Sequence, residues 1–252
     1  EFRLASRKAI DEFKEAKALG IHTRPVLVGP MTFLSLGKAK SADLDPLSLI
    51  ERVLPVYAEV LTTLASEGAD WVQIDEPILG TDLNDAQRDA FRKAYATLSK
   101  CGLKIVVATY FERLDDNLSL VAALPIDGLH IDLVRAPEQL ASVLSVWPKS
   151  RTLSLGVIDG RNIWRADLDA AFSLVEQANA FRTLANRGRW SPIRFVKGAA
   201  KGEERRIVDP GAAFIVADIM ADATARTDAF GADSALRLPF WAAVKTGTSK
   251  AM

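Results

Sequence analysis

Acidic residues stand at the ends of several short apolar runs in this sequence, and carboxylates placed together can hold a substrate amine or exchange protons with it. Asp75 and Glu76 directly follow the run Trp71–Ile74. Two later runs are closed by Asp132 and Asp159. In a parallel α/β fold, catalytic groups occupy this end of the strands. Any one of these residues can instead cap a helix or bind loop amides, but together they favour a site at the mouth of a barrel, working or vestigial.

The acidic residues need strands and helices to position them, and the sequence alternates between the two. Apolar or β-branched runs predict strands at Arg24–Gly29, Trp71–Ile74, Lys104–Phe111, Gly128–Val134 and Leu153–Ile158. Helical spacing of apolar residues predicts helices at Asp45–Gly68, Asn84–Lys100, Leu118–Leu124 and Pro137–Val146. This alternation indicates an α/β fold with a parallel sheet, either a partial (β/α)8 barrel of about five units or an open doubly wound sheet. The segment 71–77 is expected at the centre of the sheet.

Composition and charge exclude several classes of protein. Hydrophobic residues make up 49% of the chain, which is ample for a packed core. The 32 basic and 32 acidic side chains balance, so no nucleic-acid partner and no attraction to an anionic membrane are expected. No apolar run approaches the roughly 20 residues of a membrane span, and the first residues carry no signal-peptide pattern. The expected compartment is therefore the cytoplasm, and the missing initial Met suggests a fragment.

Several long stretches in the first two thirds of the chain resemble one enzyme family. These stretches are Arg24–Leu34, Leu54–Tyr57, Trp71–Pro77, Ala108–Phe111, Leu124–Val134 and Asp159–Leu168. On them, residues 10–170 resemble the N-terminal barrel of cobalamin-independent methionine synthase. The resemblance implies a (β/α)8 barrel from a family that transfers a methyl group from polyglutamylated methyltetrahydrofolate to homocysteine, with zinc as cofactor.

The resemblance also implies which functional parts this chain lacks. The zinc and homocysteine sites of the family belong to its C-terminal barrel, and its basic folate-contacting residues lie upstream of Glu1. The counterpart of the zinc-bearing strand is Ala108–Phe111, which offers no good zinc ligand. Cys101, His22 and His130 have no metal-ligand spacing, and His130 is expected to be a core histidine because its neighbours are apolar. No zinc or folate is therefore expected in this chain, and a small-molecule substrate only if the missing domains complete the site.

The last third of the chain resembles a different family. The stretches that carry this resemblance are Glu176–Asn186, Gly188–Pro192, Asp209–Ile219 and Leu238–Ser249. On them, residues 174–252 resemble the end of the transpeptidase domain of a class A penicillin-binding protein, which implies an incomplete α+β segment. The Lys-Thr-Gly strand of that family borders its active site. The resemblance therefore implies a carboxylate-binding edge at Lys245, Thr246, Gly247 and Thr248.

The attacking serine of that second family has no counterpart in a suitable place. Ser35 and Lys38 have the Ser-x-x-Lys spacing, but they fall inside the stretch that resembles methionine synthase, so the spacing is interpreted as coincidence. Without an activated nucleophile, acyl-enzyme chemistry is expected to be missing.

The two parts, residues 1–172 and 173–252, are predicted to join inside a helix. Residues at helical spacing predict one apolar face across the junction, formed by Leu168, Phe172, Val175, Ala178 and Phe181. Beyond it, the sequence predicts helices at Glu176–Gly188 and Asp209–Asp222, an extended segment at Arg189–Phe195 and a strand at Phe240–Val244. Three hypotheses of function remain open: a methyltransferase-related fragment inactive by itself, a penicillin-binding fragment without its nucleophile, and a non-catalytic chimeric scaffold.

Overall fold

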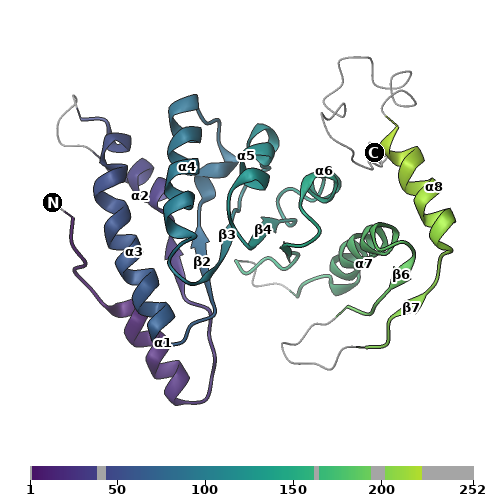
Figure 1. Ribbon diagram of the computed structural model, residues 1–252, viewed down its shortest axis with the longest axis horizontal. Coiled ribbons are helices and arrows are strands. Elements are labelled where there is room, and N and C mark those ends of the chain that lie inside the picture. Colours follow the sequence, from purple (N-terminus) through teal and green to yellow (C-terminus); the bar gives the residue numbers. More distant parts are fainter. Residues whose placement is uncertain (1, 39–43, 162–164, 194–201, 223–252) are drawn as a thin grey trace. The chain divides into compact units, whose positions relative to one another are not determined.

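The computed structural model describes residues 2–38, 44–161, 165–193 and 202–222, and the chain divides into two compact units (Figure 1). The first unit comprises Glu1–Pro137 and Trp147–Gly156, and the second comprises Glu138–Val146 and Val157–Met252. The predicted boundary between residues 172 and 173 concerns the origin of the two parts of the sequence. A division by packing does not test it.

Five parallel strands form the sheet of the first unit. They are β1 (Val26–Val28), β2 (Trp71–Asp75), β3 (Lys104–Ala108), β4 (Gly128–Asp132) and β5 (Thr152–Gly156). Each strand pairs in parallel with the next one along the chain. The order therefore advances in one direction, as in a barrel, whereas a doubly wound sheet reverses direction. The prediction of an α/β partial barrel is confirmed, but β3 and not β2 occupies the middle of the sheet.

The described part of the first unit has five α-helices, of which α3, α4 and α5 correspond to helices that the periodicity predicts. The five helices are α1 (Lys8–Ala18), α2 (Pro30–Leu36), α3 (Ile50–Ser66), α4 (Asp85–Leu98) and α5 (Leu118–Ala123), with 3-10 turns at Pro46–Leu49, Pro77–Gly80 and Asp115–Asn117. The side chain of Asn84 caps α4 together with Gln87, in a reciprocal capping box. Gly68 adopts a φ of 90° just after α3, a conformation that favours glycine and ends the helix where expected.

The core of the first unit lies between the sheet and the helices. Figure 1 shows α3 and α4 side by side along the sheet, and these two helices also contact one another. The predicted face of α4 is confirmed, because Phe91, Ala94, Tyr95 and Leu98 are all fully buried. Phe91 and Tyr95 stack with ring centroids 6.1 Å apart. Burial of a side chain as large as Phe91 or Leu98 contributes about 1.5 to 3 kcal/mol to the stability of such a layer.

The second unit contains three helices and a short hairpin within the described residues. The elements are α6 (Gln139–Val146), α7 (Leu168–Ala185), β6 (Arg189–Trp190), β7 (Arg205–Arg206) and α8 (Pro210–Ala221). Asp209 caps α8 by accepting the N–H groups of Gly211 at 2.8 Å and Ala212 at 3.1 Å, and Pro210 fits the first turn as expected. The hairpin strands pair antiparallel. Of the extended segment predicted at 189–195, the structure describes residues 189–193, and Arg189 and Trp190 form a strand.

The predicted helix across the junction is confirmed, but its predicted apolar face is wrong. Helix α7 runs unbroken through residues 172 and 173, and its N-cap is Asp167. Leu168 and Phe172 are exposed, whereas the buried positions are Ala171, Asn179 and Thr183. The buried face is thus rotated away from the apolar stripe, because Asn179 and Arg182 turn toward the backbone of Ser191 beside the hairpin.

Two further predictions concern the end of the chain and membrane-spanning helices. The strand predicted at 240–244 and the motif Lys245 to Thr248 lie outside the described residues. Within the described ranges, no helix is long and apolar enough to cross a membrane.

Candidate functional site at the carboxyl ends of the strands

The neighbouring carboxylates at the end of β2 point to opposite sides of the sheet. Successive side chains of a strand alternate between its two faces. Ile74 is fully buried, and Asp75 is partly exposed on the opposite face together with Gln73. Glu76 continues the alternation and is fully buried on the side of Ile74. The prediction that both carboxylates face the barrel mouth is therefore wrong for Glu76, because the strand geometry persists one residue past Asp75.

Glu76 binds the first turn of α2 and a tyrosine of α4. Its carboxylate accepts the N–H of Met31 at 3.2 Å, the N–H of Thr32 at 2.8 Å and the hydroxyl of Thr32 at 2.6 Å. The hydroxyl of Tyr95 donates at 3.3 Å. Burial raises the pKa of Glu76 to about 7, although the donors from Thr32, Met31 and Tyr95 act in the opposite direction.

The close approach of Glu76 to α2 depends on glycine at position 29. A Cβ atom added to Gly29 would overlap the carboxyl carbon of Glu76. Gly29 also extends the sheet, because its N–H donates to the carbonyl oxygen of Asp75 at 2.7 Å. The run Gly29-Pro30 therefore does more than end a strand: it makes room for a buried carboxyl and starts the helix that binds it.

The open face of the sheet carries a chain of hydrogen bonds that includes Asp75. Arg24 donates from Nη2 to Oε1 of Gln73 at 2.8 Å, and Gln73 donates from Nε2 to Oδ1 of Asp75 at 2.8 Å. Burial raises the pKa of Tyr110 above its ordinary value, and a hydrogen bond with Asp75 adds to the shift. Asp75 is thus a partly exposed carboxylate held in place by its neighbours, which is a suitable arrangement for binding a cationic or hydrogen-bond-donating group.

His130 joins Asp75 on this open face. The strand register places Asp75, Ala108, His130 and Ser154 abreast on four neighbouring strands. His130 Nδ1 lies 2.8 Å from Oγ of Ser154. Burial, together with the positive charge of Arg24, lowers the pKa of His130, while the carboxylates of Asp132 and Asp75 oppose that shift. The expectation of a satisfied core histidine holds in part: the imidazole has a partner in Ser154, but it is partly exposed among polar groups.

Asp132 serves the local backbone of the loop after β4. Its Oδ1 accepts the N–H groups of Val134 at 2.9 Å and Arg135 at 3.0 Å, and its Oδ2 accepts the N–H of Phe111 at 3.2 Å. Phe111 has a φ of 83°, which is unusual for a bulky residue. Asp132 therefore stabilises a strained turn at the strand ends, while its charge still acts on His130.

Asp159 belongs to the second unit. Its Oδ1 accepts the N–H of Arg161 at 3.0 Å and lies 3.6 Å from Nε of the same residue. Of the four acidic residues predicted at the mouth, the first unit contains Asp75, Glu76 and Asp132. Asp75 joins the hydrogen-bond network of the open face, and the charge of Asp132 acts on His130.

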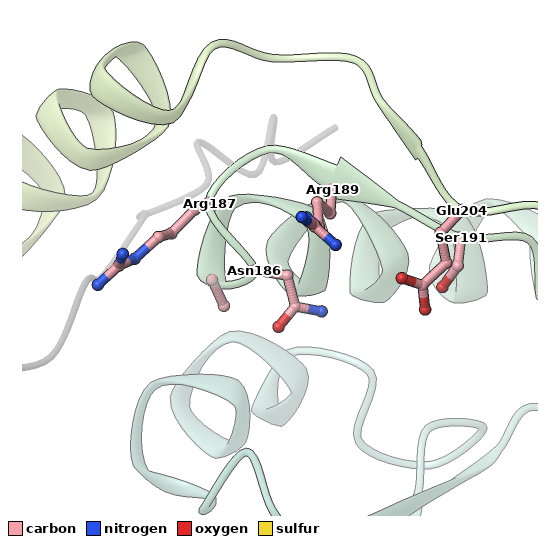
Figure 2. A pocket seen from close by; sticks show the side chains of 6 residues that line it. Asn186, Arg187, Arg189, Ser191 and Glu204 are labelled. Atoms are coloured by element: carbon pink, nitrogen blue, oxygen red, sulfur yellow. The ribbon is translucent and has the colours of Figure 1, made fainter.

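Described residues of the second unit line two pockets. Figure 2 shows the first, of about 420 Å³, in which Arg189 and Glu204 extend toward one another and Arg187 extends away from them. Its other lining residues are Ala185, Asn186 and Ser191. Both the carbonyl and the hydroxyl of Ser191 already accept from Arg182. Because most of these polar side chains are exposed, water competes for each contact that a ligand would make here.

The second pocket, of about 520 Å³, is mostly apolar and lies between α7 and the hairpin. It is lined by Glu176, Asn179, Ala180, Thr183, Leu184, Trp190, Ile193, Ile207 and Val208. Trp190 also carries the guanidinium of Arg205 over its ring, 4.7 Å from the centroid.

Metal ligands are not clustered in the part of the chain that the structure describes. Within those residues, no group of three or more His, Cys, Asp or Glu side chains is placed to hold an ion. In the predicted counterpart of the zinc-bearing strand, Ala108 and Thr109 are fully buried, and the hydroxyl of Thr109 donates to the carbonyl oxygen of His130 at 3.2 Å.

The one-directional parallel sheet, with polar groups at the carboxyl ends of its strands, defines a barrel-type α/β domain. The family model described as cobalamin-independent synthase, N-terminal domain, matches residues 1–183. The chain therefore belongs to that family, as the resemblance of residues 10–170 predicts. The match extends to residue 183 and so overlaps the start of the segment, residues 174–252, for which the sequence predicted a transpeptidase origin.

Curated relatives agree with the family and are much longer than this chain. The 5-methyltetrahydropteroyltriglutamate–homocysteine methyltransferase of Nitrobacter winogradskyi is 58% identical over 177 residues, which cover 69% of this chain and 23% of the relative. The protein of the same description from Chelativorans sp. is 59% identical over 170 residues, covering 67% of this chain and 22% of the relative. The chain thus spans about a quarter of the length of these relatives.

A solved structure supports the fold. A B12-independent methionine synthase from Shewanella sp., in complex with selenomethionine, matches with a TM-score of 0.56 and 14% identity. The match covers 72% of this chain and 57% of that one. At this identity the likeness shows the fold alone.

Proposed function

We propose that the first part of the chain, residues 1–172, is a piece of the N-terminal barrel of a 5-methyltetrahydropteroyltriglutamate–homocysteine methyltransferase. It serves methionine biosynthesis in the cytoplasm only as part of a longer enzyme and transfers no methyl group by itself. The observation that carries the proposal is the identity of 58% over 177 residues with a relative of which this chain covers 23%.

The chemistry of methyl transfer supports the inactivity of the chain by itself. Homocysteine becomes a nucleophile as its thiolate, and zinc stabilises thiolates. The whole sequence offers one cysteine and two histidines, and the resemblance assigns the zinc and homocysteine sites to a barrel that lies outside this chain. Asp75 is the best candidate for a substrate contact once the barrel is complete, because its carboxylate is on the open face. In this proposal Glu76, Asp132 and Asp159 have no contact with substrate.

A methyl-transfer assay tests this proposal. The purified chain is incubated with homocysteine, zinc and methyltetrahydrofolate triglutamate, and methionine is measured by mass spectrometry. The Nitrobacter enzyme serves as the positive control. We expect no methionine above background and no stoichiometric zinc after dialysis against a mild chelator. Catalytic turnover or retained zinc would contradict the proposal.

A second proposal concerns residues 173–252, which we assign to a transpeptidase fragment of a penicillin-binding protein. Its support is the resemblance of four stretches, including the motif from Lys245 to Thr248. Because a serine nucleophile with an adjacent base is missing, no covalent β-lactam adduct forms. Intact-mass spectrometry after incubation with excess penicillin tests this. A stable mass shift mapping to any serine would overturn it, and a shift at Ser35 would be the most damaging result.

A third proposal treats the chain as a non-catalytic chimeric scaffold. It is supported by the two different resemblances and by the continuous helix α7 across the join. Sequencing the DNA on both sides of the coding region discriminates among these proposals. A methionine synthase reading frame that continues both upstream of codon 1 and downstream of codon 252 would exclude the chimera.

A further inference from the structure

The carboxyl group of Glu76 connects the sheet to helix α2. Its backbone N–H donates to the carbonyl oxygen of Ala108 at 2.8 Å, which fixes the residue at the end of β2 beside β3. Its side chain is fully buried and binds the first turn of α2 through Met31 and Thr32. Glu76 thus connects β2, β3 and α2 through its backbone and its side chain. Helix α2 cannot leave the sheet without breaking the hydrogen bonds to the Glu76 carboxyl.

Both protonation states of this carboxyl find hydrogen-bond partners in the docked helix. The N–H groups of Met31 and Thr32 can only donate, and they complement a carboxylate oxygen. The hydroxyls of Thr32 and Tyr95 lie 2.6 Å and 3.3 Å from the carboxyl oxygens and can either donate or accept. When Glu76 gains a proton, one of these hydroxyls can turn and accept it, so that no polar group is left unpaired.

Among the residues that the structure describes, no cation pairs with the charged form of Glu76. The titratable groups on which its charge acts are Tyr57 from α3, Tyr95 from α4 and Tyr110 after β3. Its neighbour Asp75 lies on the opposite face of the sheet. The side chain that α2 turns toward Glu76 is the neutral Thr32. Within the described residues Glu76 makes no ion pair, so a buried negative charge is supported by hydrogen bonds alone.

We propose that Glu76 is a proton-controlled latch, which holds α2 against the sheet when it is protonated and favours release of α2 when it is ionised. Release would carry the Gly29-Pro30 turn away from the end of edge strand β1, because α2 follows that turn directly. As the pH rises, the carboxyl end of edge strand β1 would therefore be uncovered more often.

The direction of the effect follows from linkage. In the docked state burial raises the pKa of Glu76 to about 7. In the released state water surrounds the carboxyl and its pKa returns to the ordinary value of 4.5. The docked state therefore binds the proton more tightly. Its advantage is complete below the ordinary pKa and is lost as the pH rises through about 7.

Hydrogen exchange of the α2 amides tests the latch. Exchange is followed between pH 5.5 and pH 8.5, conditions chosen to bracket the transition, and corrected for the intrinsic pH dependence of exchange. We expect the opening constant of α2 to rise about tenfold or more across this range. The amides of α4 serve as the internal reference. In Glu76→Gln, which cannot ionise, the opening constant of α2 should stay flat. A flat profile in the wild type, or an equal rise in Glu76→Gln, would overturn the proposal.

A second pair of variants keeps the test valid if Glu76→Gln does not fold. Thr32→Val removes the hydroxyl that supports the carboxylate, and it should move the titration midpoint of Glu76 upward, as measured by carbon NMR of the carboxyl. Ser35→Ala is the matched control on the same helix, because its hydroxyl donates to the carbonyl oxygen of Met31 at 2.8 Å and not to Glu76. An unchanged midpoint in Thr32→Val would count against the latch.

Discussion

The two faces of the five-stranded sheet differ in burial and in chemistry. On the face toward α2 and α4, Ile74, Val107 and Leu129 lie abreast in the register and are fully buried. On the other face, Gln73 and His130 are partly exposed and join a polar network. One step along a strand therefore separates residues that stabilise the fold from residues available to a ligand. The buried carboxyl of Glu76 is an ionisable group on the stabilising face.

The largest expected difference between the faces is in their tolerance of truncation. Ile74→Ala should lower the free energy of unfolding by about 3 to 4 kcal/mol, since it leaves a cavity among buried side chains. Gln73→Ala removes a partly exposed neighbour on the open face and should cost less than about 1 kcal/mol. Urea denaturation followed by circular dichroism measures both. Equal costs would remove the distinction between the faces.

A smaller loss of stability is expected from a change at Gly29, whose backbone contacts the buried Glu76 carboxyl. Gly29→Ala forces the Glu76 carboxyl out of its position and should cost about 2 kcal/mol. The matched control is Gly160→Ala, where an added Cβ meets nothing within 4 Å. That control should lie within about 0.5 kcal/mol of the wild type. Thermal unfolding of the two variants checks the prediction, and a stable Gly29→Ala would show that Glu76 has room to move.

The two faces can also be compared by removing one tyrosine hydroxyl from each and measuring the loss of stability. Tyr57 donates to the carbonyl oxygen of Val28 at 2.7 Å and so ties α3 to edge strand β1. Tyr57→Phe should cost about 1 kcal/mol, the usual net value of such a hydrogen bond. Tyr110→Phe on the open face should cost less, because water can replace the lost partner of Asp75. A larger loss for Tyr110→Phe in chemical denaturation would place a structural role on the open face.

The smallest expected effects concern the titration of His130. Because its pKa is lowered by burial and by Arg24, the neutral imidazole is favoured in the folded protein, and the associated stability is lost as the pH falls below the ordinary value of 6.5. Arg24→Gln should raise this pKa, and Asp75→Asn should lower it further, since the two charges act in opposite directions. Proton NMR of the imidazole measures both shifts. Shifts of the same sign would mean that the network rearranges.

Much of the fold could be predicted because apolar spacing reflects burial directly. Helix α4 shows this well, since all four residues predicted on its inner face are buried. Helices α1 and α2 were not predicted from the sequence. Helix α2 has only seven residues, too few to display a period, and α1 buries only Ile10 and Phe13. The prediction of the buried face of α7 was wrong because Asn179 and Arg182 form tertiary hydrogen bonds with Ser191. The spacing of apolar residues does not reveal such bonds.

The candidate site was only partly predictable from the sequence. The alternation of side chains between the two faces of a strand predicts the positions of His130 and Glu76 better than the polarity of their neighbours does. His130 was expected in the core because Leu129 and Ile131 flank it, yet neighbours in a strand face the opposite side. The same rule separates Asp75 from Glu76. The links from Arg24 to Gln73 and from His130 to Ser154 join different strands, so they depend on a register that local sequence does not contain.

The contact between Gly29 and Glu76 has a consequence for how such barrels can be recombined. The two positions lie on different strand ends, yet a side chain at one excludes a side chain at the other. They should therefore vary together among descendants: a larger residue at 29 would require a shorter one at 76. A crossover placed between them is tolerated only when both parents carry the compatible pair. This is an inherited constraint on where a gene for this fold can be cut and rejoined.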